Sequence, residues 1–191
     1  MPATTPFDRV IRGTLVLPDR ILPNGWIATR GEVIAGIGEG PSPVATSVED
    51  YGSKLIMPGL VDGHMHTSSS RGWPGIEGAS KSAAAGGVTT CVDMPYDVPR
   101  PVTDAGIFKE KVEYVNRLSH VDMALYGTIL KSGGVDAIAE LAEAGVCSFK
   151  LSTYEYDPVR FPRIDHPTMV AAFLIGLFWI VVFYVTQTEY P

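Results

Sequence analysis

The segment PGLVDGHMH (residues 58–66) determines how we interpret the rest of the chain. A Pro-Gly turn leads into a short apolar run, which ends in two histidines separated by one residue. On a β-strand, residues i and i+2 point to the same face, so His64 and His66 would project side by side from the strand end. Imidazole binds zinc and other divalent metals. The alternative is a histidine pair at a strand end that binds no metal.

The order of predicted elements after this segment indicates an α/β fold. Strands and helices alternate from residue 60 onwards, which predicts βαβ units and a parallel sheet, as in a (β/α)8 barrel or a doubly wound sheet. No Gly-x-Gly-x-x-Gly follows the first strand, which counts against a dinucleotide site. The expected elements are a loop at 67–78, helices at 79–85, 103–118 and 135–144, and strands at 88–93, 121–129 and 146–152.

The part of the chain before this segment is predicted to be a small β-sandwich or open sheet. Its runs are rich in β-branched residues and are separated by turn-forming residues. We expect strands at 7–17, 26–29, 32–38 and 54–57, a turn at 23–25, and a loop at 40–51.

The predicted strand at 146–152 contains a lysine, Lys150, within an apolar run. A lysine there is costly unless it is paired, neutralised or modified, or unless its ammonium extends to solvent. Because a histidine pair ends a strand three units earlier, we favour a lysine with a lowered pKa. Such an amine can react with carbon dioxide to give a carbamate, an anionic ligand able to bridge two metal ions.

The composition excludes several classes of function. The chain has 191 residues and a formal net charge of -6, so it lacks the basic footprint of a nucleic-acid-binding protein. Its first residues show no secretory signal. Cys91 and Cys147 match no zinc or redox spacing, which favours a reducing compartment and a cytoplasmic location.

Three motifs together resemble the cyclic amidohydrolases of the amidohydrolase superfamily, which include dihydroorotases, allantoinases and hydantoinases. They are PGLVDGHMH at 58–66, SAAAGGVTTCVDMP at 82–95 and GVCSFKLS at 145–152. The resemblance extends over residues 7–173. It implies an α/β chain with a β-sandwich portion at 1–57, followed by the first half of a metal-dependent (β/α)8 barrel at 58–167.

The same resemblance implies a metal site and a reaction. His64 and His66 would bind a first zinc ion, and carboxylated Lys150 would bridge to a second. The reaction would be hydrolysis of a carbon–nitrogen bond, in which a metal-bound hydroxide opens a small cyclic amide or ureide. Metal ions suit this chemistry because they polarise the carbonyl and lower the pKa of bound water to about 7. Full-length relatives would be homo-oligomers.

Two further residues are expected to contact the substrate. Dihydroorotases usually carry an arginine two residues after the second histidine, where this chain has Ser68. Arg71 would replace it only if the loop bends back. Asp97 stands where allantoinases usually have asparagine, and the surrounding spacing resembles theirs. We therefore favour an allantoinase or a neighbouring hydantoinase.

The chain also departs from the family pattern. The second metal needs two later histidines and the general base is a late aspartate, but the remaining histidines here are His120 and His166. His120 is predicted at the wrong end of its strand, and none follows His166. A full barrel takes about 250 residues. We therefore identify no catalytic residue and expect this chain alone to be truncated and inactive, with the second metal position incomplete.

The segment MVAAFLIGLFWIVVFYV (residues 169–185) is entirely apolar. Its length is at the lower edge of the 17–25 residues or so that cross a bilayer. We expect an apolar helix at 168–186, a candidate transmembrane segment, followed by a tail at 187–191. A truncated or frame-shifted product is the favoured explanation; a single-span anchor and a helix buried in an assembly are the others. The alternative function is a non-catalytic or membrane-anchored scaffold.

Overall fold

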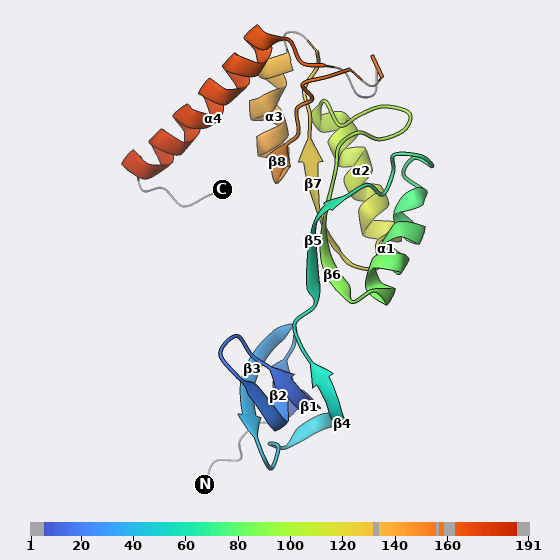
Figure 1. Ribbon diagram of the computed structural model, residues 1–191, viewed down its shortest axis with the longest axis vertical. Coiled ribbons are helices and arrows are strands. Elements are labelled where there is room, and N and C mark those ends of the chain that lie inside the picture. Colours follow the sequence, from blue (N-terminus) through green and yellow to red (C-terminus); the bar gives the residue numbers. More distant parts are fainter. Residues whose placement is uncertain (1–5, 132–133, 156, 159–162, 187–191) are drawn as a thin grey trace. The chain divides into compact units, whose positions relative to one another are not determined.

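The computed structural model describes residues 6–131, 134–155, 157–158 and 163–186. The chain divides into two compact units, Met1–Pro58 and Gly59–Pro191, whose elements are labelled in Figure 1. The predicted tail at 187–191 lies outside the described residues.

The first unit is one four-stranded sheet with the order β3-β2-β1-β4. β1 pairs antiparallel with β2 and parallel with β4, and β2 pairs antiparallel with β3. Val10, Leu15 and Ala28 are buried, as expected for alternating strands that cover one apolar face. The strands are β1 (Phe7–Val16), β2 (Ile21–Arg30), β3 (Val33–Glu39) and β4 (Ala45–Ile56).

Two expectations for this sheet were wrong. Residues 23–25 form no turn, because β2 continues through them with Asn24 at φ 53° and a register shift opposite Gly13 and Leu15. This is a β-bulge, which inserts a residue without ending the strand. The predicted loop at 40–51 is largely β4, because its polar residues pair with β1, with Ser47 opposite Arg9.

The second unit contains a four-stranded parallel sheet in chain order, β5-β6-β7-β8. Helices connect successive strands, and Figure 1 shows α1 and α2 on the same side of the sheet. This arrangement is that of the first half of a (β/α)8 barrel, so the predicted α/β fold is confirmed. The elements are β5 (Leu60–Met65), α1 (Gly75–Ala85), β6 (Val88–Asp93), α2 (Ala105–Leu118), β7 (Asp122–Gly127), a 3-10 turn (Gly134–Asp136), α3 (Ala137–Ala144) and β8 (Ser148–Phe149).

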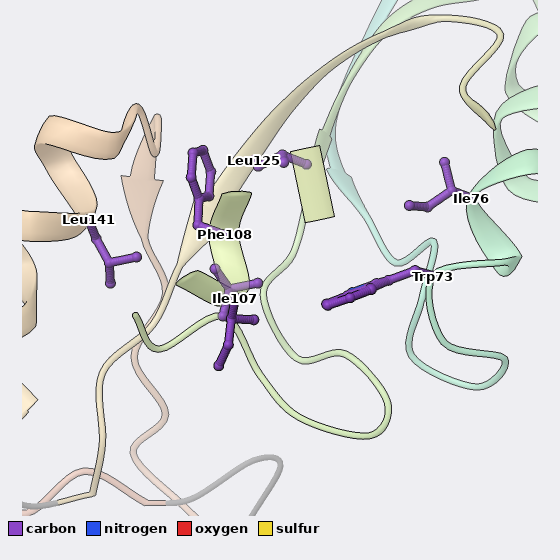
Figure 2. Packing of buried hydrophobic residues seen from close by; sticks show 7 residues of the cluster. Trp73, Ile76, Ile107, Phe108, Leu125 and Leu141 are labelled. Carbon is purple, nitrogen blue, oxygen red and sulfur yellow. The ribbon is translucent and has the colours of Figure 1, made fainter. Parts of the chain in front are cut away.

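The core of this unit is built around α2. Figure 2 shows Ile107 and Phe108 of this helix between Leu141 of α3 and the pair Trp73 and Ile76. Each of these side chains is at most 8% exposed, and burying one stabilises the fold by about 1.5–3 kcal/mol. The packing therefore fixes α2 against its neighbours and holds the loops at the carboxyl ends of the strands.

The last element is α4 (His166–Thr186), which confirms the predicted apolar C-terminal helix. Many of its apolar side chains are exposed, including those of Phe173, Leu177 and Phe178. Over the side chains that the structure describes, no helix combines the length and hydropathy needed to cross a bilayer. The predicted transmembrane segment at 168–186 is therefore not confirmed.

Candidate metal centre

The two histidines of the opening segment lie at the carboxyl end of β5. His64 is on the strand and His66 directly follows it, and their Nε2 atoms are 3.3 Å apart. The His64 backbone N–H donates to Asp62 Oδ1 at 2.9 Å, and His66 Nδ1 is 3.0 Å from Ser69 Oγ. The i, i+2 spacing therefore places the two imidazoles side by side, with their Nε2 atoms converging.

Lys150 joins this pair from a position 86 residues later in the chain. It directly follows β8, and its Nζ lies 3.1 Å from His64 Nε2. Its backbone is held on both sides: the N–H donates to Gly127 at 2.9 Å, and the carbonyl accepts from Thr128 Oγ1 at 2.7 Å and Tyr96 Oη at 3.3 Å. Burial lowers the pKa of Lys150.

The histidine pair has the spacing of two ligands on one metal ion. Two imidazole nitrogens at the usual 2.0–2.1 Å from a tetrahedral zinc ion lie about 3.3–3.4 Å apart. Burial and the nearby charge of Lys150 lower the pKa of His66, which favours the neutral, metal-binding form. No group of three or more His, Cys, Asp or Glu side chains in the described parts of the chain could hold a metal. Beside the histidine pair, the structure places the Lys150 Nζ atom, 3.1 Å from His64 Nε2.

Arg71 and Asp97, the two residues predicted to contact the substrate, differ in their exposure to solvent. Arg71 is exposed in the loop between β5 and α1. Asp97 is 1% exposed, and its Oδ2 accepts from Trp73 Nε1 at 3.3 Å and pairs with Lys111 Nζ at 2.8 Å. Burial raises the pKa of Asp97. His120 precedes β7, at the opposite end of the sheet from His64, as expected.

Sequence reasoning missed a second charged cluster, which we call the buried triad: Asp93, Lys111 and Asp97. Lys111 of α2 is fully buried, and its Nζ lies 2.7 Å from Asp93 Oδ2 and 2.8 Å from Asp97 Oδ2. The signal was present in the sequence, because Lys111 follows the apolar Ile107 and Phe108 at helical spacing. A lysine on the apolar face of a helix predicts a buried partner.

The chain is similar to allantoinases and hydantoinases. It is 32% identical over 162 residues to an allantoinase from Streptomyces avermitilis, covering 83% of this chain and 36% of the relative. It is 33% identical over 163 residues to an L-hydantoinase from Paenarthrobacter aurescens, covering 83% of this chain and 35% of the relative. No family model matches the chain. By the coverage of the two relatives, the chain spans about a third of their length.

Solved structures agree with the observed fold. An L-hydantoinase (dihydropyrimidinase) from Arthrobacter aurescens superposes with a TM-score of 0.77 at 31% identity, covering 87% of this chain and 38% of that one. A D-aminoacylase with a binuclear metal centre superposes with a TM-score of 0.58 at 17% identity, covering 75% and 38%, which shows a shared fold alone. The second unit thus corresponds to the first part of an amidohydrolase barrel.

Proposed function

We propose that this chain, a relative of the cyclic amidohydrolases, provides the first metal position of a hydrolase that opens cyclic amides or ureides. The observation that carries the proposal is the convergence of three nitrogens at the carboxyl end of the parallel sheet. His64 Nε2 lies 3.3 Å from His66 Nε2 and 3.1 Å from Lys150 Nζ. In (β/α) barrels, this end of the sheet carries the active site.

In this proposal, His64 and His66 hold one divalent ion, preferably zinc. Lys150 becomes a ligand after its neutral amine attacks the carbon of carbon dioxide, forming an N–C bond and releasing one proton. The resulting carbamate oxygens would also reach a second ion, whose other ligands are not among these residues. A divalent ion bound here supplies Lewis acidity to an amide carbonyl and activates water.

The substrate class follows from the relatives, which are named as allantoinases and an L-hydantoinase. We therefore propose a five- or six-membered cyclic amide or ureide as substrate. Arg71, exposed in the loop after His66, would contact the polar groups of the ring. Asp97 would contact substrate only after its loop rearranges, because Lys111 and Trp73 hold its carboxylate.

Carbamate formation at Lys150 tests the proposal. Zinc-loaded protein supplied with 13C-bicarbonate is expected to show a 13C carbamate resonance, which Lys150→Met removes. Lys131→Met is the matched control. Lys131 pairs with Glu155 and not with a histidine, so this variant should retain the resonance. A spectrum without the resonance, or one unchanged in Lys150→Met, would contradict the assigned role of Lys150.

A turnover assay complements this test. His64, His66 and Lys150 would supply only one of the two metal positions. We therefore expect the 191-residue chain alone to open neither allantoin nor dihydroorotate measurably. Clear, zinc-dependent hydrolysis by the purified chain would contradict this expectation.

The second candidate function is a non-catalytic, amidohydrolase-like scaffold. The observation that favours it is the apolar surface of the outer strand β5, where Leu60 and Val61 are 55% and 68% exposed. Strands of parallel sheets are normally covered on both faces, so such residues suit a protein contact. A dependence on zinc distinguishes the hydrolase from the scaffold. A scaffold requires no zinc, so His64→Ala would not affect its function.

A further inference from the structure

The buried triad links the two loops that follow β5 and β6. Asp93 is the last residue of β6, Asp97 lies in the loop after it, and Lys111 reaches both from α2. The Lys111 ammonium has three protons, and three acceptors surround it, the third being the Met94 carbonyl at 3.3 Å. A fully buried charge is tolerated only with such complete pairing. The triad is therefore a fixed point between α2 and the carboxyl end of the sheet.

Each carboxylate of the triad also binds the loop that carries His66. Asp93 accepts two hydrogen bonds from Thr67, one from its backbone N–H at 2.8 Å and one from its hydroxyl at 2.9 Å. Thr67 directly follows His66. Asp97 accepts from Trp73 Nε1 near the other end of the same loop. Both ends of the β5–α1 loop are thus attached to carboxylates that Lys111 holds.

Main-chain hydrogen bonds also join the loop after β5 to the loop after β6. The Met94 N–H donates to the Met65 carbonyl at 2.9 Å, and the Val98 N–H donates to the Ser68 carbonyl at 3.1 Å. Met65 and Ser68 lie on either side of His66 in the chain. The position of the His66 backbone therefore depends on where the second loop is held.

We propose that Lys111 is a positioning residue for the His64–His66 metal centre, acting through Asp93 and Thr67. This inference rests on the proposed function, because it assigns the triad a role in metal binding. Lys111 contacts Asp93, and Asp93 holds Thr67, the neighbour of His66, so the proposed effect of Lys111 is on the geometry of the two histidines. Loss of such outer-shell support typically lowers metal affinity by about 10–100-fold. The competing explanation is that the triad only stabilises the fold.

The test uses variants that separate these explanations. Lys111→Met alone leaves two buried carboxylates without a counter-ion and can prevent folding, so the main variant is the neutral triple Asp93→Asn/Lys111→Met/Asp97→Asn. Thr67→Val removes the hydroxyl hydrogen bonds to Asp93 and Ser68 and keeps the backbone hydrogen bond to Asp93. Leu141→Ala is the control, because it weakens the core of the same unit from α3.

Two measurements are made well below the melting temperature of each full-length variant. Zinc affinity is measured by competition with a chelating dye, and 1H–15N spectra of the histidine rings are recorded without metal. We expect the neutral triple to bind zinc about 10–100-fold more weakly, Thr67→Val to bind it about tenfold more weakly, and both to shift the His66 signals. Leu141→Ala should melt earlier but keep wild-type affinity and spectra.

The outcomes distinguish this inference from the proposed function. Wild-type affinity and unchanged His66 signals in the neutral triple would overturn the positioning role, as would an equal loss in Leu141→Ala. If the unmodified chain binds no zinc, the proposed function fails. The metal-free spectra still decide the positioning role, because shifted His66 signals confined to the triple and Thr67→Val support it.

Discussion

Two charged clusters lie at the carboxyl end of the same parallel sheet, and they are built in opposite ways. In the buried triad, one ammonium is matched by two carboxylates and a carbonyl, so its hydrogen-bonding capacity is used internally. In the exposed cluster of His64, His66 and Lys150, the His64 Nε2 atom lies 3.3 Å from His66 Nε2 and 3.1 Å from Lys150 Nζ. Charges of one sign so close would repel each other, unlike the matched charges of the triad. The matched charges explain why the triad can be fully buried, and the close basic nitrogens of the second cluster are the reason why we propose a ligand site there.

The largest effect on stability is expected when the ammonium of the buried triad is removed. Lys111→Met leaves Asp93 and Asp97 as unpaired buried charges, so the free energy of unfolding should fall by about 3–5 kcal/mol. Urea denaturation followed by circular dichroism measures this change, and the neutral triple should recover most of it. A Lys111→Met protein as stable as the unmodified chain would show that the triad is not internally compensated.

A smaller loss is expected from an acid near the triad that has a purely local role. Asp104 caps α2, and its side chain accepts from the Ile107 N–H at 2.9 Å. Asp104→Ala should lower the free energy of unfolding by about 1 kcal/mol, as typical for an N-cap. Zinc affinity should not change. A large loss of zinc binding in this variant would mean that any disturbance of α2 reaches the histidines.

The smallest stability effect is expected in the exposed cluster itself. Lys150→Met removes an amine that faces two imidazoles, so the free energy of unfolding should change by no more than about 0.5 kcal/mol. The same denaturation experiment measures it beside Lys111→Met. A loss comparable to that of Lys111→Met would place both lysines in the same structural class and remove the contrast between the clusters.

The sequence predicted the exposed cluster better than the buried one, for physical reasons. Strand periodicity requires His64 and His66 to share a face, and parallel βαβ order brings Lys150 to the same sheet end. The burial of Lys111 was not predicted, because helical periodicity shows which face is apolar but not which partners a lysine on that face would meet. The burial of Asp97 depends on a contact with α2 that no local pattern encodes.

For the fold as well, local features were predicted and long-range ones were not. The parallel sheet follows from alternating strand and helix patterns, which are local. The bulge at Asn24 and the pairing of polar β4 with β1 were not predicted, because both depend on partners elsewhere in the sheet. The structure of these two segments therefore depends on long-range strand pairing, which a local sequence pattern does not show.

Zinc titration by isothermal calorimetry tests most directly the proposal that His64 and His66 hold one divalent ion. We expect about one zinc ion per chain, lost in His64→Ala and in His66→Ala and retained in His120→Ala, because His120 lies at the other end of the sheet. An unmodified chain that binds no zinc, or zinc binding that survives both substitutions, would contradict it.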